Sequence, residues 1–139
     1  MQNTAEVPVD FRTALVDETP ESIARFKLVG EQNDRFRNTW GADFTIPGQI
    51  VQTNGVAALS FAWQAKIMTT VMQFSEFTED NDPYLKRDFG AFALTIDGKT
   101  EHFLWKVDLY DRDYRYGTDD DANPDVTRRV LTLMLSTDY

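Results

Sequence analysis

The chain has 139 residues, the length of one ordinary domain, which is enough to bury a hydrophobic core without disulfides. Acidic residues (23) outnumber basic ones (14), and a net charge of -9 argues against direct binding to nucleic acid or anionic membranes, since both need a basic surface. Cysteine is absent, which excludes a disulfide framework and a thiolate metal site.

The first residues, Met1-Gln-Asn-Thr-Ala-Glu-Val-Pro-Val-Asp10, lack the charged start and apolar centre of a signal peptide. No apolar run approaches the about 20 residues that span a bilayer, so we expect a cytoplasmic protein. Residues 1–18 show no sustained apolar period and predict a flexible leader ahead of a single domain at 19–139.

A first helix is predicted over about 20–38. Thr19 can accept a free backbone N–H at its start, and Pro20 at the first helical position loses nothing by lacking its own. The helix ends at Trp40-Gly41, and its bases form either a solvated face or a second interaction surface. These bases are Arg25, Lys27, Arg35 and Arg37.

Two short extended pieces, 44–46 and 49–53, flank the turn pair Pro47-Gly48. A second helix over about 60–74 follows, with Ser60 as its cap. Its apolar residues recur at helical spacing and therefore predict core packing. They are Trp63, Ile67, Val71 and Phe74.

A β-hairpin is predicted at the centre of the sheet, with strands at about 89–96 and 101–110. Apolar residues alternate along both strands, and Asp97-Gly98 between them is a strong signal for a tight hairpin turn. Asn123-Pro124 then favours a third helix over about 124–137. The order predicts an α+β domain: a small antiparallel sheet packed against two to three helices.

The charge is concentrated in two segments beside the hairpin. Residues 76–88 hold five acids and two bases, a sum of -3, and residues 108–125 hold seven acids and two bases, a sum of -5. The residue that enters the first strand of a hairpin and the residue that leaves the second lie at the same end. We therefore expect both acidic loops to meet opposite the Asp97-Gly98 turn.

Three interpretations of this acidic pole remain open from the sequence. The loops can be ordinary polar turns with Asp and Asn caps. They can hold a divalent cation as an optional cofactor, although no Gly and Glu stand where an EF-hand needs them. They can also bind a basic protein partner by long-range attraction, with tyrosines among the carboxylates. The candidate cation ligands are Asp80, Asp82, Asp88, Asp108 and Asp111, and the candidate partner-binding residues are Glu79, Asp80, Asp82, Tyr84, Asp88, Asp108, Asp111 and Asp113.

Signals for catalysis are weak. The lone histidine, His102, is predicted on the polar face of a strand, and Asp88-Phe89-Gly90 lacks the other parts of a kinase signature. Asp88 with Asp108 could do acid and base work because adjacent strand ends bring them near each other. The sequence favours a non-enzymatic binding protein with no cofactor. The alternative is a metal-dependent enzyme or sensor that uses the same carboxylates.

Two blocks, Asp80-Asn-Asp-Pro-Tyr84 and Trp105-Lys-Val-Asp108, resemble a small bacterial family known as domain of unknown function 3768, over about residues 30–139. In that family a Gly-Glu-His tripeptide commonly precedes Asp88-Phe89-Gly90, whereas this chain has Leu85-Lys86-Arg87. If that His binds metal or moves protons, this chain lacks it. The family carries no established activity. Its occurrence in bacterial genomes and mobile elements implies a role against host defence, such as an anti-restriction or anti-CRISPR inhibitor.

Overall fold

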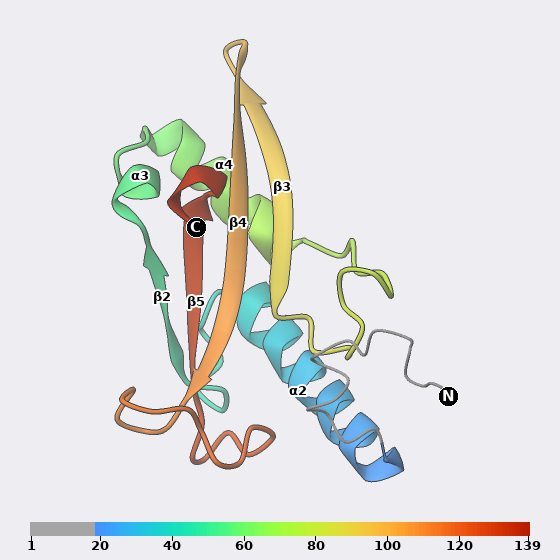
Figure 1. Ribbon diagram of the computed structural model, residues 1–139. Coiled ribbons are helices and arrows are strands. Elements are labelled where there is room, and N and C mark those ends of the chain that lie inside the picture. The colour runs from blue at the N-terminus through green and yellow to red at the C-terminus, as the bar shows by residue number, and fades with distance from the viewer. Residues whose placement is uncertain (1–18) are drawn as a thin grey trace, which may run out of the picture.

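The computed structural model describes residues 19–139, and the predicted leader at 1–18 lies outside the described residues. The fold is α+β, as the sequence predicts: one four-stranded sheet in the order β2-β5-β4-β3, with the helices α2 and α4 behind it (Figure 1). The elements are α2 (Pro20–Asn38), β2 (Gly48–Gln52), α3 (Asn54–Ala57), α4 (Phe61–Met72), β3 (Phe89–Ile96), β4 (Lys99–Tyr110), β5 (Arg128–Leu135) and the 3-10 turn η1 (Ser136–Asp138). None of the helices within residues 19–139 is long and apolar enough to cross a bilayer.

Helix α2 begins and ends as its sequence predicts. The Thr19 hydroxyl accepts a hydrogen bond from the Ser22 N–H at 3.1 Å. At the other end, the Gly41 N–H donates to Phe36 O at 2.9 Å, and the Trp40 N–H donates to Arg37 O at 3.1 Å. This pair of bonds is a Schellman motif, which closes the helix and directs the chain toward β2.

The predicted hairpin is confirmed. β3 pairs antiparallel with β4 from Phe89 opposite Lys106 to Ile96 opposite Lys99, so β4 begins two residues earlier than the sequence suggests. Asp97 and Gly98 both have positive φ, 51° and 77°, which is the conformation of a two-residue type I′ turn.

The third predicted helix, at 124–137, is wrong: residues 128–135 form strand β5 in the centre of the sheet. Asn123-Pro124 starts a turn instead, in which the Val126 N–H donates to Asn123 O at 3.2 Å. A Pro after Asn suits a turn as well as a helix start. The burial of β5 alternates between buried and half-buried positions, but the mostly apolar run 130–135 is too short for periodicity to separate a strand from a helix.

The sheet is mixed rather than antiparallel, because β2 pairs parallel with β5 while β4 pairs antiparallel with it. Of the two predicted extended pieces, only the second forms a strand. Residues 44–46 form a turn that buries the Ile46 side chain.

The hydrophobic core lies between one face of the sheet and the helices. Trp105 of β4 is fully buried at its centre, and its ring contacts Phe74 and Phe77 edge-on at centroid distances of 5.5 and 6.1 Å. The apolar face predicted for the second helix is confirmed, since Trp63, Ile67 and Val71 are buried in this core.

A buried arginine ties the two helices together. Arg37 of α2 is 1% exposed and donates hydrogen bonds to Val71 O and Phe74 O, both at 2.9 Å, at the end of α4. Its guanidinium also bonds Asp34 at 2.6 Å and lies 5.0 Å from the Trp105 ring centroid. It therefore gives carbonyls in and just beyond the last turn of α4 a charged donor, at the negative end of the helix dipole. Burial lowers the pKa of Arg37, and Asp34 opposes that shift.

Candidate functional site

The two acidic loops lie on either side of α2 and are held by consecutive residues of that helix. The Asn33 amide donates to Lys86 O in the first loop at 2.8 Å, and the Gln32 amide donates to Ala122 O in the second at 3.0 Å. Arg129 of β5 fixes both amides by donating to Asn33 Oδ1 at 2.7 Å and to Gln32 Oε1 at 2.9 Å. Burial lowers the pKa of Arg129 to about 10.

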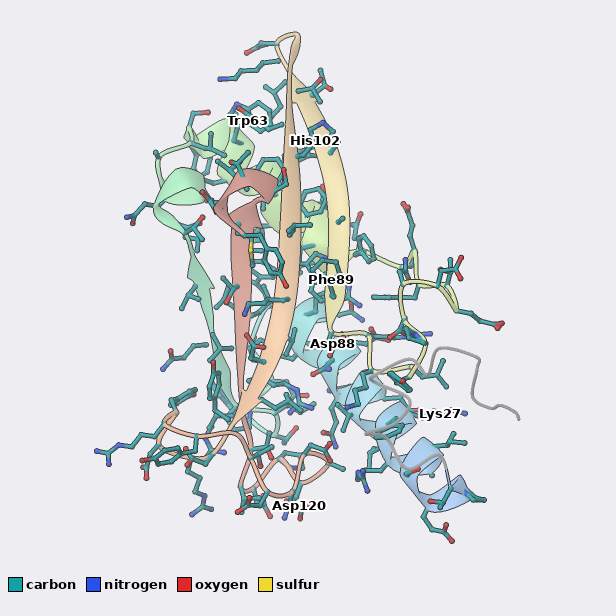
Figure 2. The ribbon with its side chains drawn as sticks, viewed as in Figure 1. Lys27, Trp63, Asp88, Phe89, His102 and Asp120 are labelled. Atoms are coloured by element: carbon teal, nitrogen blue, oxygen red, sulfur yellow. The ribbon has the colours of Figure 1, made fainter. Side chains whose placement is uncertain are left out.

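Both loops leave the hairpin at the end away from the Asp97-Gly98 turn. Figure 2 shows Asp88 and Asp120 toward that end and His102 nearer the turn. They do not leave at the same level, because Phe89 pairs with Lys106 and β4 continues four residues further, to Tyr110. The second loop therefore starts about 13 Å beyond the first along the sheet.

The Asn-Asp-Pro block of the first loop builds the loop itself. Asp82 is only 7% exposed, and its carboxylate accepts the Arg87 N–H at 2.9 Å. The Asn81 side chain accepts the Thr78 N–H at 2.7 Å and donates to Glu76 O at 2.8 Å. These bonds order the backbone of residues 76–87 and leave Asp82 little surface for a partner.

The end of the first loop packs closely on α2. A Cβ at Gly30 would lie 2.1 Å from Leu85 O, so only glycine permits this approach. Leu85 and Arg87 both have positive φ, 63° and 51°, which costs free energy in residues that carry a Cβ. The Arg87 guanidinium, which bonds Asp34 at 2.5 Å, helps to hold this conformation.

Asp88 lies half-buried where the first loop enters β3. Burial raises the pKa of its carboxyl, and the charges of Asp82 and Asp108 add to the rise while Lys86 opposes it. Asp108 bonds Lys106 at 2.9 Å, and that hydrogen bond raises the pKa of Lys106. The structure thus brings Asp82, Asp88 and Asp108 into one electrostatic neighbourhood.

In the second loop, Asp111 has a turn-forming role. Its carboxylate accepts the N–H groups of Asp113 and Arg115, both at 3.1 Å, and its own N–H donates to Tyr116 O at 2.8 Å. Tyr84 of the first loop packs edge-on against Phe26 of α2, with 6.1 Å between ring centroids. In the described part of the chain, the hydrogen bonds of the Asp111 carboxylate stay within the second loop, at Asp113 and Arg115.

Three of the candidate residues, Glu79, Asp80 and Asp113, are exposed and form no ion pair within residues 19–139. Four more acids in the same segments share these properties, and the sequence reasoning counted their charge without assigning them to the site. They are Glu76, Asp119, Asp120 and Asp125. Asp120 precedes the pair Asp121 and Ala122, which contact α2 at Arg25 and Gln32, so it lies close to the helix that separates the loops.

The bases of α2, in contrast, are largely occupied by acids of the same chain. Arg25 pairs with Asp121 at 3.3 Å, and Arg37 pairs with Asp34. Arg35 pairs with Asp43, and this bond, with those from Thr45, lowers the pKa of Asp43 to about 2. The structure neutralises most of the helix predicted to be basic and leaves the loop carboxylates exposed.

The candidate metal ligands do not gather at one point in the described part of the chain. Within residues 19–139, no three side chains of Asp, Glu or His lie close enough together to hold a metal ion. His102 is exposed on the face of the sheet opposite the helices, opposite Ala93 of β3. The carboxylates near Asp88 therefore have no histidine beside them.

The fold and the site define an acidic α+β domain whose loops present carboxylates on both sides of one helix. The chain belongs to a family described as a protein of unknown function (DUF3768), whose family model matches residues 52–138. The match includes α4, the hairpin, both acidic loops and β5, and leaves α2 outside. No curated protein and no solved structure matches the chain. Membership confirms the resemblance seen in the sequence.

Proposed function

We propose that the protein is a non-enzymatic binding protein whose exposed loop carboxylates occupy a basic surface of a nucleic-acid-handling partner in the cytoplasm. One observation carries this proposal: within residues 19–139 the loops keep seven exposed acids without an ion pair, while α2 between them has most of its bases paired with acids of the same chain. The available surface charge is therefore more one-sided than the composition alone indicates.

The arrangement suits attraction at long range. At physiological salt the screening length is about 8 Å, so the exposed carboxylates within one loop act together on an approaching basic surface, and the two loops, whose starts are about 13 Å apart, form two separate acidic clusters. Such complementarity raises association rates and selects partners by charge. In this proposal the carboxylates supply the negative charges that the phosphates of a nucleic acid would supply to the same basic surface. An inhibitor of restriction or CRISPR proteins is one example of such a binding protein.

The loops are also well ordered for this role. Asp82 and Asp111 accept backbone N–H groups inside their turns, which fixes the positions of their exposed neighbours Asp80 and Asp113. A preordered surface loses less conformational entropy on binding than a mobile one. The buried and turn-forming carboxylates thus hold the loop backbone in place, and the exposed carboxylates are positioned by that backbone.

The test is a pull-down with the full chain from an extract of the native host, at low and at high salt. We expect a captured protein that also binds duplex DNA, that is released at high salt, and that is lost with the double variant Asp80→Lys, Asp120→Lys. Asp97→Asn, which removes an exposed charge at the hairpin turn, is the matched control and should retain capture. Capture that survives the charge reversal contradicts the proposal.

A further inference from the structure

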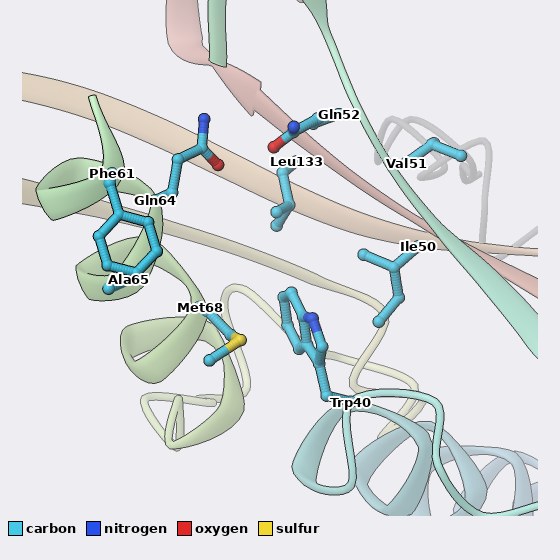
Figure 3. Close-up of a pocket in the computed structure, with 9 residues that line it drawn as sticks. All are labelled: Trp40, Ile50, Val51, Gln52, Phe61, Gln64, Ala65, Met68 and Leu133. Carbon is cyan, nitrogen blue, oxygen red and sulfur yellow. The ribbon is translucent and has the colours of Figure 1, made fainter. Parts of the chain in front are cut away.

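An apolar groove lies between β2 and α4, on the side of the sheet away from β3 (Figure 3). It has a volume of about 480 Å³, and Figure 3 shows the Trp40 indole between Met68 of α4 and Ile50 of β2. Phe61 at its rim is 86% exposed. No charged residue of the described part of the chain lines the groove, whose remaining walls are Val51, Gln52, Gln64, Ala65 and Leu133.

The backbone at Trp40 is unusual. Its φ of +52° places it at the helix-ending position where glycine is the usual residue. A bulky side chain in this conformation costs on the order of 1 kcal/mol. The conformation directs the indole into the groove, so the strain coincides with the placement of a large aromatic surface beside an edge strand.

Strand β2 has an open edge beside this groove. It pairs with β5 on one side, and no segment within residues 19–139 pairs with the other. The Thr53 N–H donates to Leu133 O and Pro47 O accepts from the Arg129 N–H, so the odd-numbered residues direct their main-chain groups to β5. By alternation, the main-chain groups of Gly48, Ile50 and Gln52 point outward.

This edge carries none of the features that usually protect an edge strand. Its sequence, Gly48-Gln-Ile-Val-Gln52, contains no charge, no proline and no bulge residue. It is also close to self-complementary: a two-fold axis at Ile50 would pair Ile50 with its own copy and Gly48 with Gln52 of the other copy. All the outward groups would then form hydrogen bonds, and both Phe61 rims would meet the facing groove.

We propose that a second copy of this chain occupies the groove, through antiparallel pairing of β2 with β2 of the other copy. The contact would cover the exposed surface of Phe61, Met68 and Val51 together with both edge main chains. A specific interface of this kind must bury roughly 1,000 Å² in total.

Other occupants fit the groove less well. The leader joins the chain at Thr19, and the groove lies at Trp40, beyond the 19 residues of α2. That helix is about 28 Å long, so a segment that precedes Thr19 would have to run back along its whole length to reach the groove. A charged peptide would find no charged residue in the groove to pair with. A second copy matches the neutral, self-complementary edge.

The test is sedimentation of the full chain over a range of micromolar concentrations. We expect the mass to rise from 16.0 kDa toward twice that value as concentration increases. Phe61→Glu should keep the chain monomeric, while Leu28→Glu, an equal change at a residue 43% exposed on α2, should leave dimerisation intact. Because each copy carries a charge of -9, added salt should strengthen the dimer, the opposite of its effect on the proposed partner binding.

Hydrogen exchange of the same samples tells this dimer from one formed elsewhere. We expect the Ile50 amide to be protected in the wild type at high concentration and to exchange fast in Phe61→Glu. A chain that stays monomeric at all concentrations overturns the proposal. So does a dimer that survives Phe61→Glu with the Ile50 amide unprotected.

Discussion

Charged side chains differ between the interior beside α2, where they are buried and hydrogen-bonded, and the loops around it, where they are exposed. In the interior, Arg37 and Arg129 are fully enclosed, and each is held by hydrogen bonds to groups of the same chain. In the loops, Glu79, Asp80 and Asp120 face solvent with no ion pair inside residues 19–139. A charge count therefore says little about which charges a partner can reach; burial and pairing decide it.

The largest expected loss of stability comes from replacing Arg37. Arg37→Ala should lower the free energy of unfolding by about 3–5 kcal/mol, because it leaves Asp34 and the α4 carbonyls without their buried partner. Urea unfolding measures it. Arg35→Ala, which removes an exposed ion pair of the same helix, should cost less than about 1 kcal/mol. Equal losses for the two variants would mean that Arg37 is not a buried cap.

The second comparison lies within the first acidic loop. Asp82→Ala should cost about 1–3 kcal/mol, since the Arg87 N–H loses its acceptor in a buried turn. Asp80→Ala, two residues away and exposed, should stay within about 0.5 kcal/mol of the wild type. Thermal unfolding of both variants checks this difference. If Asp80→Ala lowers the stability as much as Asp82→Ala does, the assignment of Asp82 as structural and Asp80 as merely exposed is contradicted.

A third variant should be more stable than the wild type. Leu85 has a φ of 63° and is 44% exposed, and glycine adopts this left-handed conformation without steric cost. Leu85→Gly should raise the free energy of unfolding by about 0.5–1 kcal/mol, because it removes the left-handed strain at little loss of packing. Gly98→Ala, at the hairpin turn with a φ of 77°, should act in the opposite direction. Chemical denaturation of both tests the assignment.

The smallest effect concerns Asp88 and depends on pH. Burial raises the pKa of Asp88 above 3.8, so its favourable contribution to folding is complete below 3.8 and is lost as pH rises through the folded-state pKa. Asp88→Asn should therefore be more stable than the wild type near neutral pH, by up to about 1 kcal/mol. The difference should shrink on acidification toward 3.8. A difference that stays constant with pH would contradict this.

The hairpin and the first two helices follow from local signals in the sequence. Thr19-Pro20 starts a helix, and Asp97-Gly98 adopts the backbone conformation of its turn in the structure as it does in isolated hairpins. The signal at Asn123-Pro124 fits two structures, and only pairing with β2 and β4 selects the strand. The parallel pairing with β2 joins residues about 80 positions apart, which no local pattern reports.

Charge and hairpin geometry predict two acidic loops at the end of the hairpin away from its turn, but they do not predict that α2 lies between the loops or which of the carboxylates are buried. Asp82 and Asp80 look alike in sequence, but one is enclosed by the turn that it forms and the other is exposed. The sequence does not indicate the role of Arg37 either, because the charge of a helix does not tell which of its bases are buried. Knowledge of which groups are buried requires the tertiary structure.

The most direct test of the proposed function is competition between this protein and duplex DNA for a captured partner. If the loop carboxylates occupy the basic surface of that partner, DNA should displace the wild-type protein, and the affinity should fall with salt. Asp80→Lys with Asp120→Lys should abolish binding while the unfolding midpoint stays unchanged. Simultaneous binding of DNA and this protein to the partner would contradict the account.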